Sequence, residues 1–155
     1  MSTHDRHGFD ERQRGALAAA VERIVPTDDD PGAREAGTIE YVLARARSTA
    51  DAAGLYERGT DLLDRLAHES GASTFADLAA DRQDAVLSSL ERVGDPFFRR
   101  LVVDTLEGFY GDPRHGGNAG AVGWRMLGFP GPTGGRGYEA PLGWYDATAP
   151  PEPLP

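Results

Sequence analysis

The fold is decided by residues 95–110, which read DPFFRRLVVDTLEGFY. Asp95 followed by Pro96 is the clearest helix start in the chain, because aspartate caps the free amides of a first turn and proline fits the first helical position. The side chains that then recur at helical spacing are mostly apolar: Phe97, Phe98, Leu101, Val102, Thr105, Leu106 and Phe109. A stripe this broad predicts the central helix of a bundle, with these residues in the core.

A first helix is predicted upstream, between Asp10 and Pro26. Asp10 is an N-cap candidate with Gln13 at the capping-box position, and apolar residues follow at helical spacing until the proline stops the run. Residues 28–30 are three aspartates followed by Pro31. This arrangement suits a helix start, and a capped turn is favoured over a calcium loop, because Pro31 and the residues after it supply no further oxygen ligands at alternating positions.

Three more helices are predicted before the central one. The first begins at Thr38, the next ends at Gly71, and the last runs from Asp81 to about Gly94. No stretch alternates polar and apolar residues with a period of two, so little or no sheet is expected. The predicted fold is all-α: about five helices packed antiparallel in a compact bundle, followed by a long Gly/Pro-rich irregular C-terminal segment.

Charge and hydrophobicity limit which partners and which cellular compartment are expected. The 155 residues carry a net charge of −9, so nucleic acid and anionic membrane would repel the protein, and another protein or a neutral ligand is favoured. No run approaches the roughly 20 apolar residues of a membrane span, so direct membrane insertion is not expected. The N-terminus shows no secretory leader, which predicts a cytoplasmic protein unless a leader was removed or a partner carries the chain to the periplasm or cell exterior.

The character of the sequence changes at Gly111. Eleven of the 20 glycines and eight of the 11 prolines lie from this position onward, together with both tryptophans, Trp124 and Trp144. Large aromatic residues in such a segment are typical of a chain that docks on a surface, which is either a partner or the protein's own bundle. The predicted divisions are a flexible N-terminus at 1–8, a helical domain at 9–132 and an extended tail at 133–155.

No catalytic, cofactor or metal site is predicted in this chain. His115 lies between Asp112 and Asn118 in a glycine-rich loop, but a hydrolase also needs an activated nucleophile, and the nucleophile-elbow pattern does not occur. The lack of lysine excludes a Walker-type phosphate loop, and the lack of cysteine excludes thiolate metal ligands. A small enzyme using Asp112 and His115 stays open as an alternative, as does a stand-alone helical homo-oligomer.

Two stretches near the C-terminus carry a family resemblance. Residues 106–118, LEGFYGDPRHGGN, and residues 123–132, GWRMLGFPGP, resemble the C-terminal signature of the gluconate 2-dehydrogenase subunit 3 family. Residues 24–32, IVPTDDDPG, with residues 36–37, resemble the N-terminal half of that family. The resemblance spans about residues 9–132.

The resemblance implies a small, non-catalytic accessory subunit that holds no cofactor itself. In such complexes a large subunit of the glucose-methanol-choline (GMC) type holds FAD and oxidises a sugar or polyol, and a cytochrome c subunit often takes the electrons. The small subunit binds the large one and supports its folding or assembly. The residues expected to contact the partner are Asp112, Arg114, His115, Asn118, Trp124, Arg125, Phe129 and Trp144.

Overall fold

The computed structural model describes residues 8–129, 131 and 132. Within them the chain forms six α-helices, three short 3-10 helices and no strands, which confirms the all-α prediction. The elements in chain order are α1 (Glu11–Ile24), α2 (Thr38–Ala46), α3 (Ala50–Glu69), η1 (Phe75–Asp77), α4 (Ala80–Val93), α5 (Pro96–Tyr110), η2 (Pro113–His115), η3 (Ala119–Ala121) and α6 (Val122–Met126). The sixth helix and two of the 3-10 helices lie in a segment that was predicted to be irregular.

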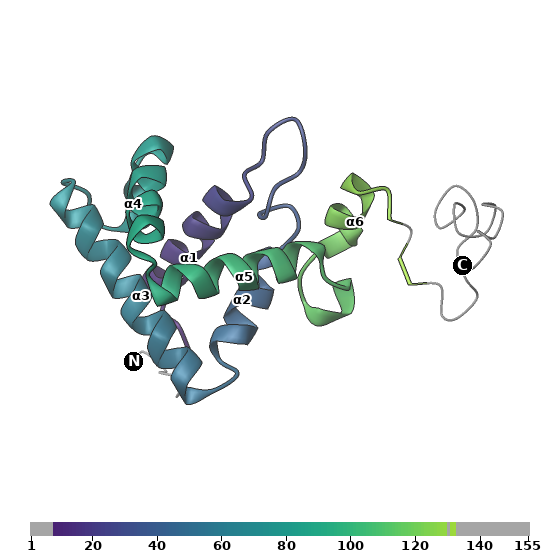
Figure 1. Ribbon diagram of the computed structural model, residues 1–155, viewed down its shortest axis with the longest axis horizontal. Helices are drawn as coiled ribbons and strands as arrows, with labels where there is room; N and C mark the ends of the chain where they lie inside the picture. Colours follow the sequence, from purple (N-terminus) through teal and green to yellow (C-terminus); the bar gives the residue numbers. More distant parts are fainter. Residues whose placement is uncertain (1–7, 130, 133–155) are drawn as a thin grey trace, which may run out of the picture.

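The helices gather around α5, as predicted for the central helix. Figure 1 shows α5 running along the long axis of the molecule, with α3 and α4 near its start and α6 beyond its end. The axes of α3, α4 and α5 point in three different directions in this view, so the predicted antiparallel stacking is wrong. The most extensive helix pairing joins α2 to α5.

The predicted caps explain where α1 and α5 begin and where α4 ends. Asp10 and Gln13 form both bonds of the capping box, at 2.8 and 3.1 Å, and the Asp95 side chain accepts the Phe98 amide at 3.0 Å. Gly94 ends α4 in the left-handed conformation that glycine favours, with φ of +67°. These signals are local, since each joins residues within one helical turn.

Residues 28–30 form the predicted capped turn, and no helix starts at Pro31. The Asp28 side chain accepts the backbone amide of Asp30 at 2.9 Å, which closes a turn two residues long. The next helix begins only at Thr38. The three aspartates therefore stand at the exposed tip of the α1–α2 connection.

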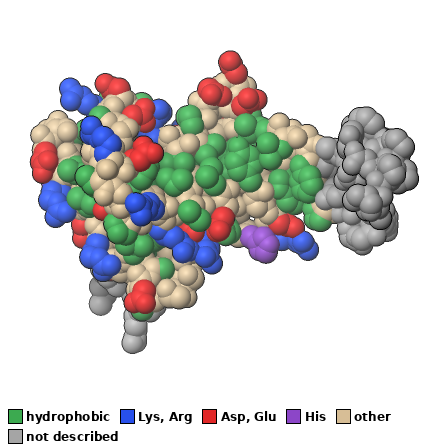
Figure 2. Space-filling view, viewed as in Figure 1, with side chains coloured by type: hydrophobic (Ala, Val, Ile, Leu, Met, Phe, Trp, Pro, Cys, Tyr) green, Lys and Arg blue, Asp and Glu red, His purple; other side chains and the backbone are tan. Residues whose placement is uncertain are grey.

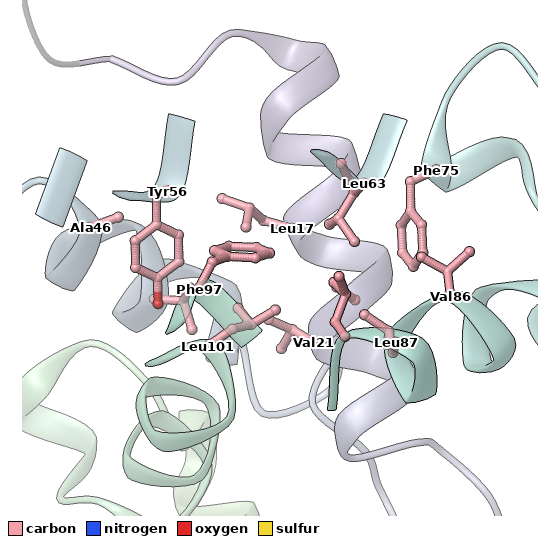
Figure 3. Close-up of a cluster of buried hydrophobic side chains, with 14 of the residues drawn as sticks. Leu17, Val21, Ala46, Tyr56, Leu63, Phe75, Val86, Leu87, Phe97 and Leu101 are labelled. Atoms are coloured by element: carbon pink, nitrogen blue, oxygen red, sulfur yellow. The ribbon is translucent and has the colours of Figure 1, made fainter. Parts of the chain in front are cut away.

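The main core fills the space between α1, α3, α4 and α5. Figure 3 shows apolar side chains from these helices pointing toward one another, among them Leu17, Leu63 and Leu101. The rings of Tyr56 and Phe97 meet edge to face, with centroids 5.6 Å apart. Each of these buried side chains contributes about 1.5–3 kcal/mol by leaving water.

The buried stripe of α5 differs from the predicted one. Phe98 and Val102 were assigned to the core but are only half-buried. Leu106 was assigned to the core, but 43% of its surface is exposed. Asp104, a carboxylate, is fully buried instead. The reason is geometric: at about 100° per residue, position 104 falls about 20° from Phe97, whereas position 106 falls on the opposite side of the helix from Phe97.

The contact between α3 and α5 depends on Gly59, and its alanine variant tests this. A Cβ atom at Gly59 would lie 2.2 Å from the Phe97 ring, so Gly59→Ala is expected to lower the free energy of unfolding by about 1–3 kcal/mol. Gly54→Ala in the same helix is the control, because it meets only the end of the Arg58 side chain. It should raise stability by about 0.5–1 kcal/mol. If urea unfolding showed that both variants raise the free energy of unfolding equally, the packing of Phe97 on α3 would be contradicted.

Candidate functional site

The loop that follows α5 is held by the side chain of Asn118. Asn118 is fully buried and adopts a left-handed backbone conformation, with φ of 48°. Its Nδ2 donates to the Gly111 carbonyl and its Oδ1 accepts the Gly123 amide, each at 2.8 Å. One side chain thus ties the C-terminal end of α5 to the first turn of α6.

Two glycines let this loop lie directly on α5. A Cβ atom at Gly117 would stand 2.2 Å from the Gly108 carbonyl oxygen, and one at Gly123 would stand 2.2 Å from the Phe109 carbonyl oxygen. Both obstacles are backbone atoms, which cannot rotate away. The loop is therefore a shaped and closely packed part of the domain.

The same region is also joined to the α1–α2 connection. The Ala119 amide donates to the Ala36 carbonyl at 2.8 Å. Ala36, Phe109 and Val122 form a second buried apolar cluster, on which Val25 packs. The two halves of the quoted signature, far apart in sequence, are thus in contact.

Asp112, Arg114 and His115 lie on the outside of the loop. Asp112 caps η2 by accepting the Arg114 amide at 2.9 Å, and it also pairs with the Arg114 guanidinium at 2.6 Å. These bonds occupy the Asp112 carboxylate, so it does not form an acid–base dyad with the exposed His115 side chain. Arg114 and His115 are placed where a partner can reach them.

The Asp112–Arg114 pair gives a prediction about acid. Hydrogen bonds from the Arg114 side chain, and then from its backbone amide, lower the pKa of Asp112 to about 2 from the ordinary value of 3.8. The pKa of Asp112 is lower in the folded state than in the unfolded state. The stabilisation that Asp112 gives the folded state is therefore complete above the ordinary pKa and is lost as the pH falls toward 2. An NMR titration of the Asp112 carboxyl carbon should show this low midpoint, and Arg114→Gln should return it toward 3.8. A wild-type midpoint at the ordinary value would mean that the pair is open in solution.

Trp124 and Arg125 belong to α6, and Phe129 follows it. Trp124 is partly buried, donates its indole N–H to the Tyr110 carbonyl at 2.7 Å, and meets the Phe129 ring edge-on at 5.1 Å. The exposed Arg125 guanidinium donates to the Gly120 carbonyl. Trp124 is thus anchored in part on its own domain, while Trp144 and the tail at 133–155 lie outside the described residues.

Asn118 is placed differently from the other predicted contact residues. Its side chain is fully buried within this chain, and the nitrogen and the oxygen of its amide group are both already bonded. It holds the loop that carries Arg114 and His115, and its side chain has no surface to offer a partner.

A large exposed apolar surface lies on α5 and α6, which we call the α5–α6 face. Among the described residues, five of the six large hydrophobic side chains that are exposed lie on α5, on α6 or directly after α6. They are Val103, Leu106, Tyr110, Met126 and Leu127. Figure 2 shows hydrophobic side chains forming a continuous band along α5 and on to α6. Exposed apolar surface concentrated in this way is typical of a protein–protein interface.

Sequence reasoning missed a buried polar cluster around Asp104. Asp104 accepts the Tyr56 hydroxyl and the Arg100 Nε, each at 2.8 Å, and its other oxygen lies 3.6 Å from the Arg45 Nε. Burial and the bond to Asp104 raise the pKa of Tyr56, and the same carboxylate raises that of Arg100. The cluster joins α2, α3 and α5. A polar residue one turn from both Leu101 and Gly108 was the only signal for it in the sequence.

Two other features, a metal site and a membrane-spanning helix, are not found among the described residues. In the described part of the chain, no group of three or more His, Asp or Glu side chains is arranged to hold a metal ion. None of the described helices is long and apolar enough to cross a membrane.

Comparison with known proteins shows which protein family this chain matches. The family model for gluconate 2-dehydrogenase subunit 3 matches residues 11–131, which include all six helices and the loop held by Asn118. The chain belongs to the gluconate 2-dehydrogenase subunit 3 family. No curated protein and no solved structure matches the chain.

Membership in the gluconate 2-dehydrogenase subunit 3 family confirms the resemblance found in the sequence. The family description names a subunit of a dehydrogenase, so the chain is related to one part of a multi-subunit complex. The matched range ends just after α6, at Gly131, and therefore contains the whole α5–α6 face.

Proposed function

We propose that this chain is a non-catalytic accessory subunit that binds an FAD-containing dehydrogenase subunit of the GMC type and supports its folding or assembly. The observation that carries the proposal is the family match over residues 11–131. The α5–α6 face supports it, because a chain with this much exposed apolar side chain on two helices gains by covering it. On this proposal the FAD and the oxidised sugar or polyol belong to the partner, and a cytochrome c subunit is a further member of the complex.

Purification of the tagged full-length chain from its native host tests the proposal. The expected result is a yellow complex that contains a larger chain and shows a flavin spectrum. A host strain that lacks this chain should contain less folded flavoprotein, because the accessory role is to support it. The flavin must leave with the larger chain when the complex is dissociated.

Two outcomes would contradict the proposal. One is a colourless preparation that holds only copies of this chain, which would favour the stand-alone homo-oligomer. The other is turnover by the isolated chain that His115→Ala abolishes while the fold is unchanged, which would favour the small enzyme.

A further inference from the structure

The α5–α6 face is longer than its exposed residues alone indicate. At about 100° per residue, Val102 is the neighbour of Leu106 on the surface of α5, and Phe98 is one turn earlier. Phe98 and Val102 line a hollow of about 230 Å³ together with Ile24 and Leu87. Four polar residues complete its lining: Arg23, Asp84, Ser88 and Glu91. The apolar band thus ends in a recess large enough to receive an apolar side chain from outside.

An acidic loop stands at the edge of this band. Asp28, Asp29 and Asp30 are exposed at the tip of the α1–α2 connection, and none of the ion pairs between described residues includes them. Figure 2 shows the group of acidic side chains at the tip, above the hydrophobic band. The base of this connection is fixed to the end of α5 and to α6 through Ala36 and Val25.

The negative charge of the protein limits which molecules can cover this surface. A second copy would bring another net charge of −9 and another acidic tip, so electrostatic repulsion opposes self-association. Residues 133–155 contain one arginine and three acidic residues, so this segment has an excess of negative charge as well. A partner with basic side chains beside an apolar ridge is complementary to both the acidic tip and the band.

We infer that the acidic tip and the α5–α6 face form one docking surface, and that the flavoprotein subunit covers it with an apolar ridge flanked by arginine or lysine. This inference rests on the proposed function. The ridge buries Leu106 and Tyr110 and places a side chain in the hollow beside Val102. The basic flank faces Asp29 and Asp30 across the edge of the band.

The occupant is identified by a photo-crosslinking amino acid at position 106 of the full-length chain, expressed in the native host. The expected product joins this chain to the flavoprotein. A crosslinker at Val93 is the control, because that side chain is 77% exposed but lies at the end of α4, off the α5–α6 face. Crosslinks from position 106 to a second copy, or to residues 133–155 of the same chain, would overturn the inference.

Binding of purified variants to the isolated flavoprotein tests the chemistry of the surface. Leu106→Ser is expected to raise the Kd at least about tenfold, as for an interface anchor, and Val93→Ser should leave it unchanged. Asp29→Asn/Asp30→Asn should slow association severalfold and reduce its salt dependence. Glu57→Gln/Glu69→Gln on α3 removes the same charge from exposed positions and is the matched control.

The outcomes separate the inference from the function on which it rests. If the wild-type chain binds the flavoprotein and all four variants bind equally well, the docking surface is elsewhere and the proposed function stands. If the control variants weaken binding as much as Leu106→Ser and Asp29→Asn/Asp30→Asn, the inferred surface is also wrong. If no flavoprotein binds the wild-type chain, the proposed function fails and the inference fails with it.

Discussion

Replacing Asn118 by leucine is expected to release residues 111–126 from the end of α5 while the helical bundle stays folded. The Gly123 amide and the Gly111 carbonyl both lose their partner, at a cost of about 1–3 kcal/mol for each buried group. Leucine also adds about 1–2 kcal/mol of strain in the left-handed conformation that Asn118 adopts. A total of about 3–8 kcal/mol is enough to open a loop locally.

Hydrogen exchange measures this opening directly. In Asn118→Leu the amides of Gly123 and Ala119 should exchange much faster than in the wild type, whereas amides of α3 should keep their protection. Flavoprotein binding should weaken, because α6 and its part of the α5–α6 face are no longer positioned.

Asn118→Asp is the graded control for this position. Its carboxylate still accepts the Gly123 amide, and aspartate tolerates the left-handed region, but the donor to Gly111 is lost. The hydrogen-exchange rates of the loop amides in Asn118→Asp should therefore lie between those of the wild type and those of Asn118→Leu. Full protection of the loop in Asn118→Leu would contradict the proposed role of this side chain.

Replacing Asp104 by alanine is expected to lower the free energy of unfolding by about 2–4 kcal/mol. The buried Tyr56 hydroxyl loses its acceptor, and Arg45 on α2 and Arg100 on α5 itself lose the carboxylate between them. Arg45 and Arg100 are 41% and 37% exposed, so water partly compensates them, which keeps the loss below that of a fully buried pair. Urea or thermal unfolding measures the change.

Two controls separate burial from charge at this cluster. Asp104→Asn retains an oxygen for the Tyr56 hydroxyl and should cost less, about 1–2 kcal/mol. Asp61→Ala removes a carboxylate that also pairs with an arginine, Arg12, but its side chain is 63% exposed, so the loss should be below about 1 kcal/mol. Equal losses for Asp104→Ala and Asp61→Ala would show that Asp104 is not buried in solution.

The sequence predicted the features that depend on near neighbours. The capping box at Asp10, the start of α5 at Asp95 and the end of α4 at Gly94 each involve residues within one turn, so their patterns are readable without the fold. The family signature is likewise a linear pattern, and the match over residues 11–131 confirmed it.

The burial of single residues on α5 was not predictable in the same way. Periodicity indicates an apolar side of a helix, but which arc becomes buried depends on the helices that pack around it. Only the partners Tyr56, Arg45 and Arg100 make position 104 suitable for a carboxylate, and they come from three different helices. Leu106 remains outside because no described element covers that side of α5.

The all-α class and the positions of the main helices were thus predictable from the sequence, because local hydrogen bonds and periodicity specify them, and the family was identified from its linear signature. The tertiary structure decided that the Gly/Pro-rich stretch after Tyr110 folds into a packed loop and a sixth helix. It also placed the signature's two halves in contact through Ala36 and Ala119 and left the α5–α6 face uncovered. These features arise from contacts between residues far apart in the chain. Local sequence patterns do not show which of these contacts form.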